Sequence, residues 1–180
     1  NIILLSDNIA ESYNQAVNKC NRDWIVFLDV DAIVTPNWLK NMYKITKFDN
    51  TGAIGPLTNN VIGQALDFDF STEIEINNLA YNIEKNNNGI SQKILALNGA
   101  CLLLNKKALV KISGLDSNIE NEAIWDDLSC RLITAGYNLL LSCDTFVYFT
   151  GEARVRNSYE EKKKKWGFDF FYSNGCRVDL

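Results

Sequence analysis

The segment that most constrains the fold is an apolar run that ends in two aspartates. Ile25 to Leu28 are four consecutive apolar residues, and Asp29 and Asp31 follow them. An unbroken apolar run favours a central strand buried on both faces. The aspartates would then lie at the carboxyl edge of an α/β sheet, where ligands usually bind. This segment therefore predicts an α/β fold with a site at its strand ends.

The spacing of the two aspartates indicates a cation site. In an extended segment, side chains two residues apart point the same way, so we expect Asp29 and Asp31 to face one ligand and Val30 to point into the protein. Two neighbouring carboxylates repel, and a divalent cation that also binds substrate phosphate oxygens relieves this repulsion. The alternative is that the acids cap the next helix or lie in a solvated turn. Thr35 followed by Pro36 is typical of a helix start.

The rest of the chain alternates between strand and helix patterns. Helices are expected over residues 10–20, 36–48, 73–85, 106–112 and 126–135, and strands over residues 2–5, 24–28, 53–55, 93–97, 99–104, 138–142 and 145–149. Residues 56–65 are expected to form a loop. This order predicts a mixed, mostly parallel sheet flanked by helices. We expect one domain over residues 1–180, with a core over about 1–150 and an aromatic and basic tail over 151–180.

Composition excludes several classes of function. The chain has 180 residues, of which 47% are hydrophobic, and a net charge of −4, which argues against a general affinity for nucleic acid. Lys162 to Lys165 form a basic run that suits a solvated helix face. No apolar run approaches the roughly 18 residues that cross a bilayer, and no signal peptide pattern opens the chain. We therefore expect a cytoplasmic protein.

Cysteine and histidine usage restricts the chemistry further. The five cysteines have no Cys-x-x-Cys spacing, so neither a disulfide framework nor a zinc site is indicated. Histidine is absent from the sequence, which excludes Ser-His-Asp and Cys-His nucleophiles and zinc sites built on imidazole. Any acid–base step would use carboxylate, Lys, Tyr or Cys side chains.

Three groups of candidate residues occur in order along the chain. They are Asp29 with Asp31, Asn98 with Gly99, and Trp125 followed by Asp126 and Asp127. Over about residues 14–150 the chain resembles the nucleotide-sugar-dependent glycosyltransferases of family 2, which have the GT-A fold. The resemblance is carried by four ordered segments: IVFLDVDAIVTPNWL, AIGPLTNNVIGQ, LALNGACLLLNKKALVKISGLD and WDDLSCRLITAGYNLLLSCDTFVYF.

The resemblance implies an inverting glycosyltransferase that uses a donor such as a UDP- or dTDP-sugar, a Mg²⁺ or Mn²⁺ ion and an acceptor hydroxyl. The metal would be held by Asp31, with Asp29 nearby, and would neutralise charge on the diphosphate leaving group. The donor would be bound by Asp29, Asn98, Gly99 and Trp125, with the bare glycine allowing close backbone approach. Asp127 or Asp126 would take the acceptor proton. A saccharide or lipid-linked acceptor at the inner face of the membrane, in cell-surface polysaccharide synthesis, is also implied.

The same residues also fit structural roles. Asn98 and Gly99 suit a turn or bulge between strands. Asp126 or Asp127 suits a helix cap, and Asp127 suits an ion pair with Arg131 four residues later. Trp125 fits a buried core position as well as a platform against a sugar face.

The chain departs from the family pattern at three places. The Glu-Asp that usually precedes the Leu-Ser-x-Arg helix falls on Ile124 and Trp125, so tryptophan holds the usual base position. The metal-binding histidine after the last strand is replaced within Tyr148 to Thr150. The family's first strands, which bind nucleobase and ribose, have no counterpart, so we expect a fragment, a chain completed by a partner, or loss of donor binding. An open sheet edge would favour a homodimer.

Two other functions fit parts of the sequence. One is a catalytically inactive saccharide-binding or assembly module on the same fold, as Trp125 and the missing histidine suggest. The other is a haloacid-dehalogenase-like phosphatase with Asp29 as nucleophile and Asp31 as acid. That family usually has Thr or Val where this chain has Ile33, and its downstream lysine motif is not identified here.

Overall fold

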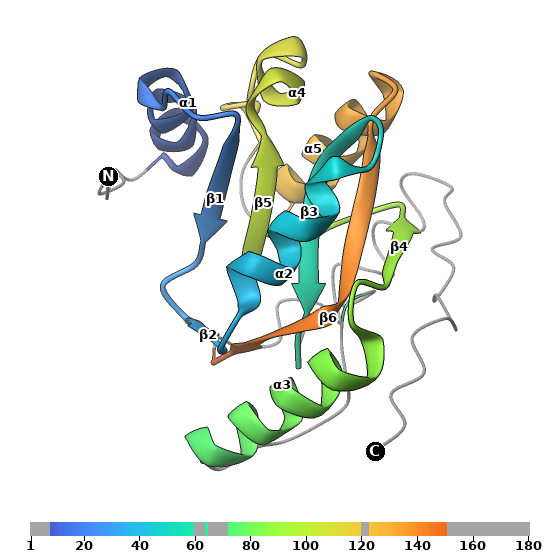
Figure 1. Ribbon diagram of the computed structural model, residues 1–180. Coiled ribbons are helices and arrows are strands. Elements are labelled where there is room, and N and C mark those ends of the chain that lie inside the picture. The colour runs from blue at the N-terminus through green and yellow to red at the C-terminus, as the bar shows by residue number, and fades with distance from the viewer. Residues whose placement is uncertain (1–7, 60–63, 65–71, 120–122, 151–180) are drawn as a thin grey trace, which may run out of the picture.

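The computed structural model describes residues 8–59, 64, 72–119 and 123–150 (Figure 1). The expected strand over residues 2–5 and the tail over residues 151–180 lie outside them. The helices are α1 (Ile9–Lys19), α2 (Trp38–Lys44), the 3-10 helix η1 (Ile45–Lys47), α3 (Glu73–Asn87), α4 (Lys106–Lys111) and α5 (Ala123–Thr134). The strands are β1 (Trp24–Leu28), β2 (Ala32–Val34), β3 (Thr51–Leu57), β4 (Ser91–Ile94), β5 (Cys101–Asn105) and β6 (Asn138–Phe149).

The described strands form one sheet in the order β1-β5-β3-β6-β2, with β4 also paired to β6. Helices flank this sheet, which confirms the predicted mixed α/β class (Figure 1). Among these strands only β3 and β6 are parallel neighbours, whereas we expected mostly parallel pairing. The difference arises because β5 lies between β1 and β3 and runs antiparallel to both.

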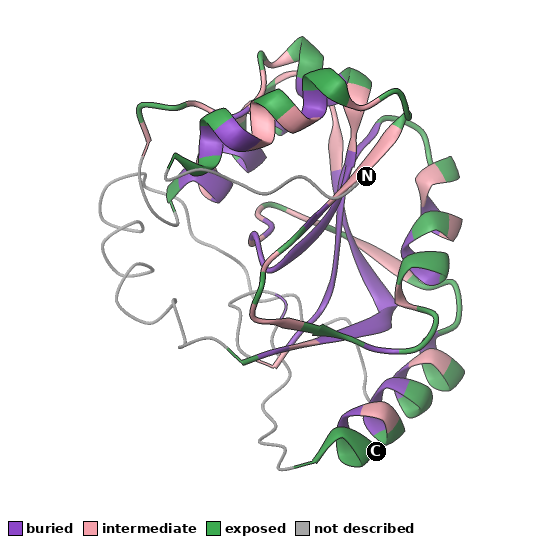
Figure 2. Ribbon diagram, turned by 90° about the vertical axis from the view of Figure 1, so that its left-hand side faces the viewer, coloured by how far each residue is buried: buried purple, intermediate pink, exposed green. Residues whose placement is uncertain are grey.

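The pleat of the sheet divides the core into two layers. Strand β5 is buried along almost its whole length, and successive side chains point to opposite faces. Leu102 and Leu104 pack with α1, α4 and α5, whereas Cys101 and Leu103 pack with α2 and η1. Helix α3 packs separately against β6. Figure 2 shows the strands largely buried between these helices.

Strand β1 differs from the predicted central strand. Its bounds match the expected residues 24–28, but Phe27 is the one fully buried side chain in it, and Leu28 is 40% exposed. The expectation of burial on both faces was wrong for this strand. Within the described part of the chain, β1 pairs with β5 alone and stands at the end of the strand order.

Side-chain caps explain several helix starts. The Asn8 side chain accepts the Glu11 N–H at the start of α1, and Thr72 and Glu75 form a capping box at the start of α3. The predicted cap at Thr35 was wrong. The N-cap of α2 is Asn37, which has a positive φ of 63° and no side-chain cap bond, and Thr35 instead donates its hydroxyl to the Phe146 carbonyl.

Strand β6 joins the two strands expected over 138–142 and 145–149. The polar residues between them remain buried because they satisfy one another. Ser142 donates to Asp144 at 2.9 Å, and Asp144 also accepts the Gly89 N–H at 2.8 Å. The pairing with β3 shifts here, from Pro56 opposite Ser142 to Leu57 opposite Phe146. The sequence break therefore marks an irregularity within one long strand.

Candidate functional site

Asp29 and Asp31 lie in a tight turn at the end of β1. The Asp29 N–H donates to the Ala100 carbonyl at 3.0 Å, and the Ala32 N–H donates back to the Asp29 carbonyl at 3.2 Å. Within the turn, the Asp31 N–H donates to Asp29 Oδ1 at 2.9 Å. Val30 at the tip is 98% exposed, so the expectation that it points into the protein was wrong. Strand alternation fails here because the backbone has already turned.

We call the turn over residues 29–32 the acid turn. Its far end is held by Thr150, the residue that follows β6. Thr150 donates both its N–H, at 2.9 Å, and its hydroxyl, at 3.0 Å, to the Asp31 carbonyl. Strand β2 begins at the next residue, with Ala32 opposite Phe149. Asp29 and Asp31 are both partly buried. The backbone that carries the two carboxylates is therefore fixed at both ends by hydrogen bonds.

The Asn98–Gly99 turn lies beside the acid turn. The side chain of Asn98 accepts the Ala100 N–H at 3.1 Å, and the carbonyl of Ala100 accepts the Asp29 N–H. Two segments about 70 residues apart in the sequence are thus joined through Ala100. The structure brings four of the predicted site residues together, after the end of β1 and before the start of β5.

Trp125 lies beneath this turn. Its side chain is 6% exposed, and its ring packs against Tyr13 and Phe27 with centroid distances of 5.9 and 6.4 Å. A Cβ atom added at Gly99 would lie 2.0 Å from Trp125 Cε2. The glycine is therefore needed on the protein side, where the indole occupies the space of a side chain. Trp125 occupies a core position.

Asp126 stands in the first turn of α5 and Asp127 directly follows it, but the two differ in their partners. Asp127 Oδ2 accepts two hydrogen bonds from Arg131, at 2.7 Å from Nε and 2.5 Å from Nη2. The same arginine donates to the carbonyls of Ile112 and Gly114 at 2.8 and 2.6 Å. Asp127 thus belongs to an ion pair that ties α5 to the end of α4. Asp126 is partly buried and lies one residue after Trp125.

Electrostatics connect the acid turn to the core below it. Burial and, secondarily, the negative charge of Asp29 raise the pKa of Tyr13 above its usual value. On α5, burial and then the charges of Asp126 and Asp127 raise the pKa of Cys130. Burial also raises the pKa of the Cys101 thiol, at the start of β5, to about 12. These two cysteines are therefore thiols at neutral pH.

The acid turn offers few protein ligands for a metal. Within the described ranges, no group of three or more His, Cys, Asp or Glu side chains could hold an ion. Asp29 and Asp31 nevertheless supply carboxylate oxygens, which Mg²⁺ and Mn²⁺ prefer. Such ions often take one or two protein carboxylates and fill the shell with water and phosphate oxygens. In their donor chemistry, the two residues suit an ion of this kind that arrives with a phosphate-bearing ligand.

The sequence analysis assigned no role to two amide side chains, one that bonds to Asn98 and one that bonds to Phe149 beside the acid turn. Gln64 is 2% exposed and accepts the Asn98 N–H at 3.0 Å. Asn59 accepts the Phe149 N–H at 2.7 Å and donates to the Phe149 carbonyl at 3.0 Å. Both lie in the segment expected to be a loop. Asn and Gln are uncharged and belong to no periodic apolar pattern, so the sequence did not distinguish these two from ordinary loop amides.

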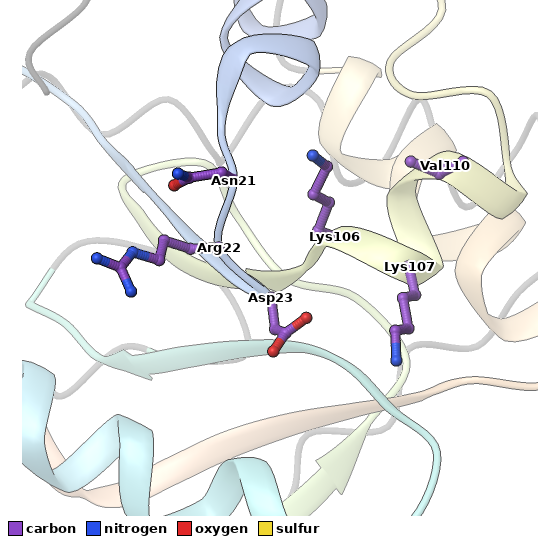
Figure 3. A pocket seen from close by; sticks show the side chains of 6 residues that line it. All are labelled: Asn21, Arg22, Asp23, Lys106, Lys107 and Val110. Carbon is purple, nitrogen blue, oxygen red and sulfur yellow. The ribbon is translucent and has the colours of Figure 1, made fainter.

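A separate hollow of about 380 Å³ lies at the other end of β1, near the start of α4 (Figure 3). It is lined by Asn21, Arg22, Asp23, Lys106, Lys107 and Val110. Figure 3 shows Arg22 and Lys107 pointing in different directions. The ammonium group of Lys106 donates a hydrogen bond to the Cys20 carbonyl. The hollow contains none of the predicted site residues, and its cations do not converge.

Helices that could cross a bilayer were sought in the described part of the chain, and none is long and apolar enough.

Comparison with known proteins identifies relatives of the fold. The model of a family described as "Glycosyl transferase family 2" matches residues 2–113, which include Asp29, Asp31, Asn98 and Gly99 but not Trp125, Asp126 or Asp127. A search of curated proteins finds no match.

Two solved structures show the extent of the likeness. The crystal structure of GalNAc-T7 with UDP, GalNAc and Mn²⁺ superposes with a TM-score of 0.59 at 13% identity, covering 91% of this chain and 36% of that chain. The catalytic domain of Drosophila β1,4-galactosyltransferase 7, in complex with xylobiose, gives a TM-score of 0.47 at 14% identity, covering 98% of this chain and 66% of that chain. The present chain therefore spans little more than a third of the first structure, and the likeness is one of fold.

Proposed function

Because the chain belongs to glycosyl transferase family 2 and has the GT-A fold, we propose that it transfers a sugar from a nucleotide-diphosphate donor to an acceptor hydroxyl, with inversion at the anomeric carbon. The main supporting observation is the 3.0 Å hydrogen bond from the Asp29 N–H to the Ala100 carbonyl. This bond holds the acid turn against the Asn98–Gly99 turn. A donor with a diphosphate and a sugar needs charged and neutral polar groups side by side, and Asp29, Asp31 and Asn98 would supply them.

The carboxylates of Asp31 and Asp29 would hold a Mg²⁺ or Mn²⁺ ion. When bound there, the ion would neutralise the charge that develops on the diphosphate as the sugar leaves. The GalNAc-T7 structure contains Mn²⁺ together with UDP, which makes the same pairing a reasonable proposal for this chain. Asp29 would be the more constrained ligand, because its Oδ1 also accepts the Asp31 N–H.

Asn98, which is partly exposed, would bind the donor, and the buried Gly99 would support it by letting the turn lie directly on Trp125. This proposal changes the expected role of Trp125. A ring that is 6% exposed supplies little surface to a sugar, whereas its contact with Gly99 fixes the position of the turn.

Asp126 would serve as the general base. Asp127 is held by two hydrogen bonds from Arg131, so moving its carboxylate or protonating it would disrupt that pair. In the transfer step, Asp126 takes the proton of the acceptor hydroxyl while the hydroxyl oxygen bonds to the anomeric carbon. The bond from that carbon to the diphosphate oxygen breaks, and its electron pair leaves with the nucleotide diphosphate. Attack from the side opposite the leaving group inverts the anomeric configuration.

The family resemblance also leads us to propose a saccharide or lipid-linked acceptor, with action in the cytoplasm at the inner face of the membrane during cell-surface polysaccharide synthesis. A homodimer through the β1 edge is part of the same proposal, because β1 pairs with one described strand only. The phosphatase interpretation has lost its support, since the family match includes both Asp29 and Asp31.

Isothermal titration with UDP and Mn²⁺ tests the proposal. We expect Mn²⁺-dependent binding that falls by about tenfold or more in Asp31→Ala, in line with loss of one charged ligand. Asp23→Ala is the matched control, because Asp23 is an exposed aspartate at the opposite end of β1. Absence of metal-dependent binding of UDP, dTDP and GDP, both in this chain and in the full-length gene product, would refute the proposal. Binding without sugar transfer by the full-length product would instead support the inactive saccharide-binding module.

A further inference from the structure

A buried amide side chain connects strand β3 to the Asn98–Gly99 turn. Gln64 donates from Nε2 to the Pro56 carbonyl at 2.7 Å and accepts the Asn98 N–H on Oε1 at 3.0 Å. Its own carbonyl accepts the Thr58 N–H at 2.8 Å. A Cβ atom at Gly55 would lie 2.6 Å from Gln64 Nε2, so the glycine leaves the space that this amide fills. Gln64 is thus fixed from three directions.

From Asn98 the hydrogen bonds continue to the acid turn. The Asn98 side chain accepts the Ala100 N–H at 3.1 Å, and the Ala100 carbonyl accepts the Asp29 N–H at 3.0 Å. Asp29 Oδ1 then accepts the Asp31 N–H at 2.9 Å. The first and last of these bonds each lie within one turn, and the bond from Asp29 to Ala100 joins the two turns.

A second amide closes the path on its other side. The Asp31 carbonyl accepts hydrogen bonds from the N–H and the hydroxyl of Thr150. The preceding residue, Phe149, forms two hydrogen bonds with the side chain of Asn59, one through its N–H and one through its carbonyl. Asn59 follows Thr58, whose N–H donates to Gln64. The path therefore returns to its origin. It forms a closed ring of hydrogen bonds and short backbone links that includes Asp29, Asp31 and Asn98.

We propose that Gln64 and Asn59 are positioning residues that hold the acid turn and the Asn98–Gly99 turn in a fixed relation. This inference rests on the proposed function for its catalytic meaning. Loss of one partner leaves a buried polar group unpaired, and connected hydrogen bonds strengthen one another. Catalytic and metal-binding geometry tolerates displacements of only about 0.5 Å. Loss of one amide should therefore loosen groups elsewhere in the ring.

Amide hydrogen exchange on the unliganded 180-residue chain tests the ring without any ligand. In Gln64→Met, which keeps the length of the side chain but removes both hydrogen bonds, we expect exchange of the Asp31 and Ala100 amides to accelerate by about tenfold or more. Neither amide bonds to Gln64 directly. The matched control is Asn41→Leu, since Asn41 is 1% exposed and donates to the Asp144 carbonyl at 3.3 Å, outside the ring. Unchanged exchange at Asp31 and Ala100 in Gln64→Met would overturn the proposal.

Should Gln64→Met fail to fold, Asn59→Ala provides the same test from a partly exposed position. It removes both bonds to Phe149, and we expect faster exchange at Asp31. Unchanged exchange in that variant overturns the ring equally.

Titration with UDP and Mn²⁺ then tests the positioning role. We expect the dissociation constant to rise by about tenfold in Gln64→Met and to stay at the wild-type value in Asn41→Leu, at a temperature where both are folded. Accelerated exchange with wild-type affinity would overturn the positioning role. If the wild-type chain binds no UDP, the proposed function fails, and the exchange results alone decide whether the ring couples the two turns.

Discussion

The indole of Trp125 occupies the space that a side chain at residue 99 would need, since a Cβ atom on Gly99 would lie 2.0 Å from Trp125 Cε2. Trp125 belongs to α5, and Gly99 belongs to the turn that precedes β5. The serine one turn later in α5, Ser129, accepts the Leu97 N–H at 3.1 Å and donates to the Trp125 carbonyl at 2.8 Å. Helix α5 and the proposed donor-binding turn are therefore packed as one unit.

Gly99→Ala should destabilise the protein by about 1–3 kcal/mol, the usual cost of forcing extra volume into a packed core. Equilibrium unfolding in urea measures this change. The double variant Gly99→Ala with Trp125→Leu should lose less stability than the sum of the two single variants, because the smaller side chain at residue 125 frees the space. If the stability losses of the two single variants simply add in the double variant, the proposed contact between residues 99 and 125 is contradicted.

Asp126→Asn and Asp127→Asn should affect different properties. Asp126→Asn should lower kcat by about 10²–10⁴ with little change in stability, as expected for loss of a general base. Asp127→Asn should cost about 1–3 kcal/mol of stability, because it weakens the charged hydrogen bonds from Arg131, and should leave kcat near the wild-type value. Steady-state kinetics and urea unfolding of both variants check this. The reverse pattern would assign the base to Asp127.

The pKa of Tyr13 predicts an alkaline effect on stability. Its folded-state pKa is raised, first by burial and then by the charge of Asp29, whereas an unfolded tyrosine ionises near pH 10. The contribution of the neutral phenol is therefore fully present below about pH 10 and is lost as pH rises toward the folded pKa. Above pH 10, Tyr13→Phe should lose stability less steeply than the wild type. Urea unfolding at several alkaline pH values measures this.

Tyr43→Phe is the control for that experiment, because Tyr43 is 58% exposed. Its stability should follow the wild-type pH curve. If the free energy of unfolding falls equally steeply with pH in the wild type and in Tyr13→Phe, the predicted effect of burial is contradicted.

Val30 and Phe27 should respond very differently to truncation. Val30 is 98% exposed at the tip of the acid turn, so Val30→Ser should change stability by less than about 0.5 kcal/mol. Phe27 is 2% exposed and stacks on Tyr13 at 4.1 Å, so Phe27→Ala should cost about 3–5 kcal/mol. Urea unfolding distinguishes the two. A large loss of stability in Val30→Ser would instead support the inward orientation first expected for Val30.

Local signals predicted much of the fold because they act over a few residues. The bounds of β1 matched, and α1 and α3 began within one residue of the prediction, since apolar periodicity and polar caps define them. Strand β2 was missed, because three residues carry no periodic signal and the pairing of Ala32 with Phe149 is a long-range event. The join within β6 was missed for a similar reason: the partner of Asp144 that keeps it buried is Gly89, far away in the sequence.

The candidate site was predicted in part. The family resemblance pointed to Asp29, Asp31, Asn98 and Gly99, and the structure brings them together, although their roles remain proposals. The orientation of Val30 was wrong, because alternation of side chains applies to extended backbone and fails in a turn. Gln64 could not be recognised, since its significance depends on being buried against Pro56 and Asn98.

The two hydrogen bonds from Thr150 to the Asp31 carbonyl place the exit of the described chain beside the acid turn. A fluorescent reporter attached at residue 150 would accordingly sit next to the place where a cation and a nucleotide are proposed to bind. Its emission could follow ligand arrival directly, while the helices and the interior of the sheet remain chemically untouched.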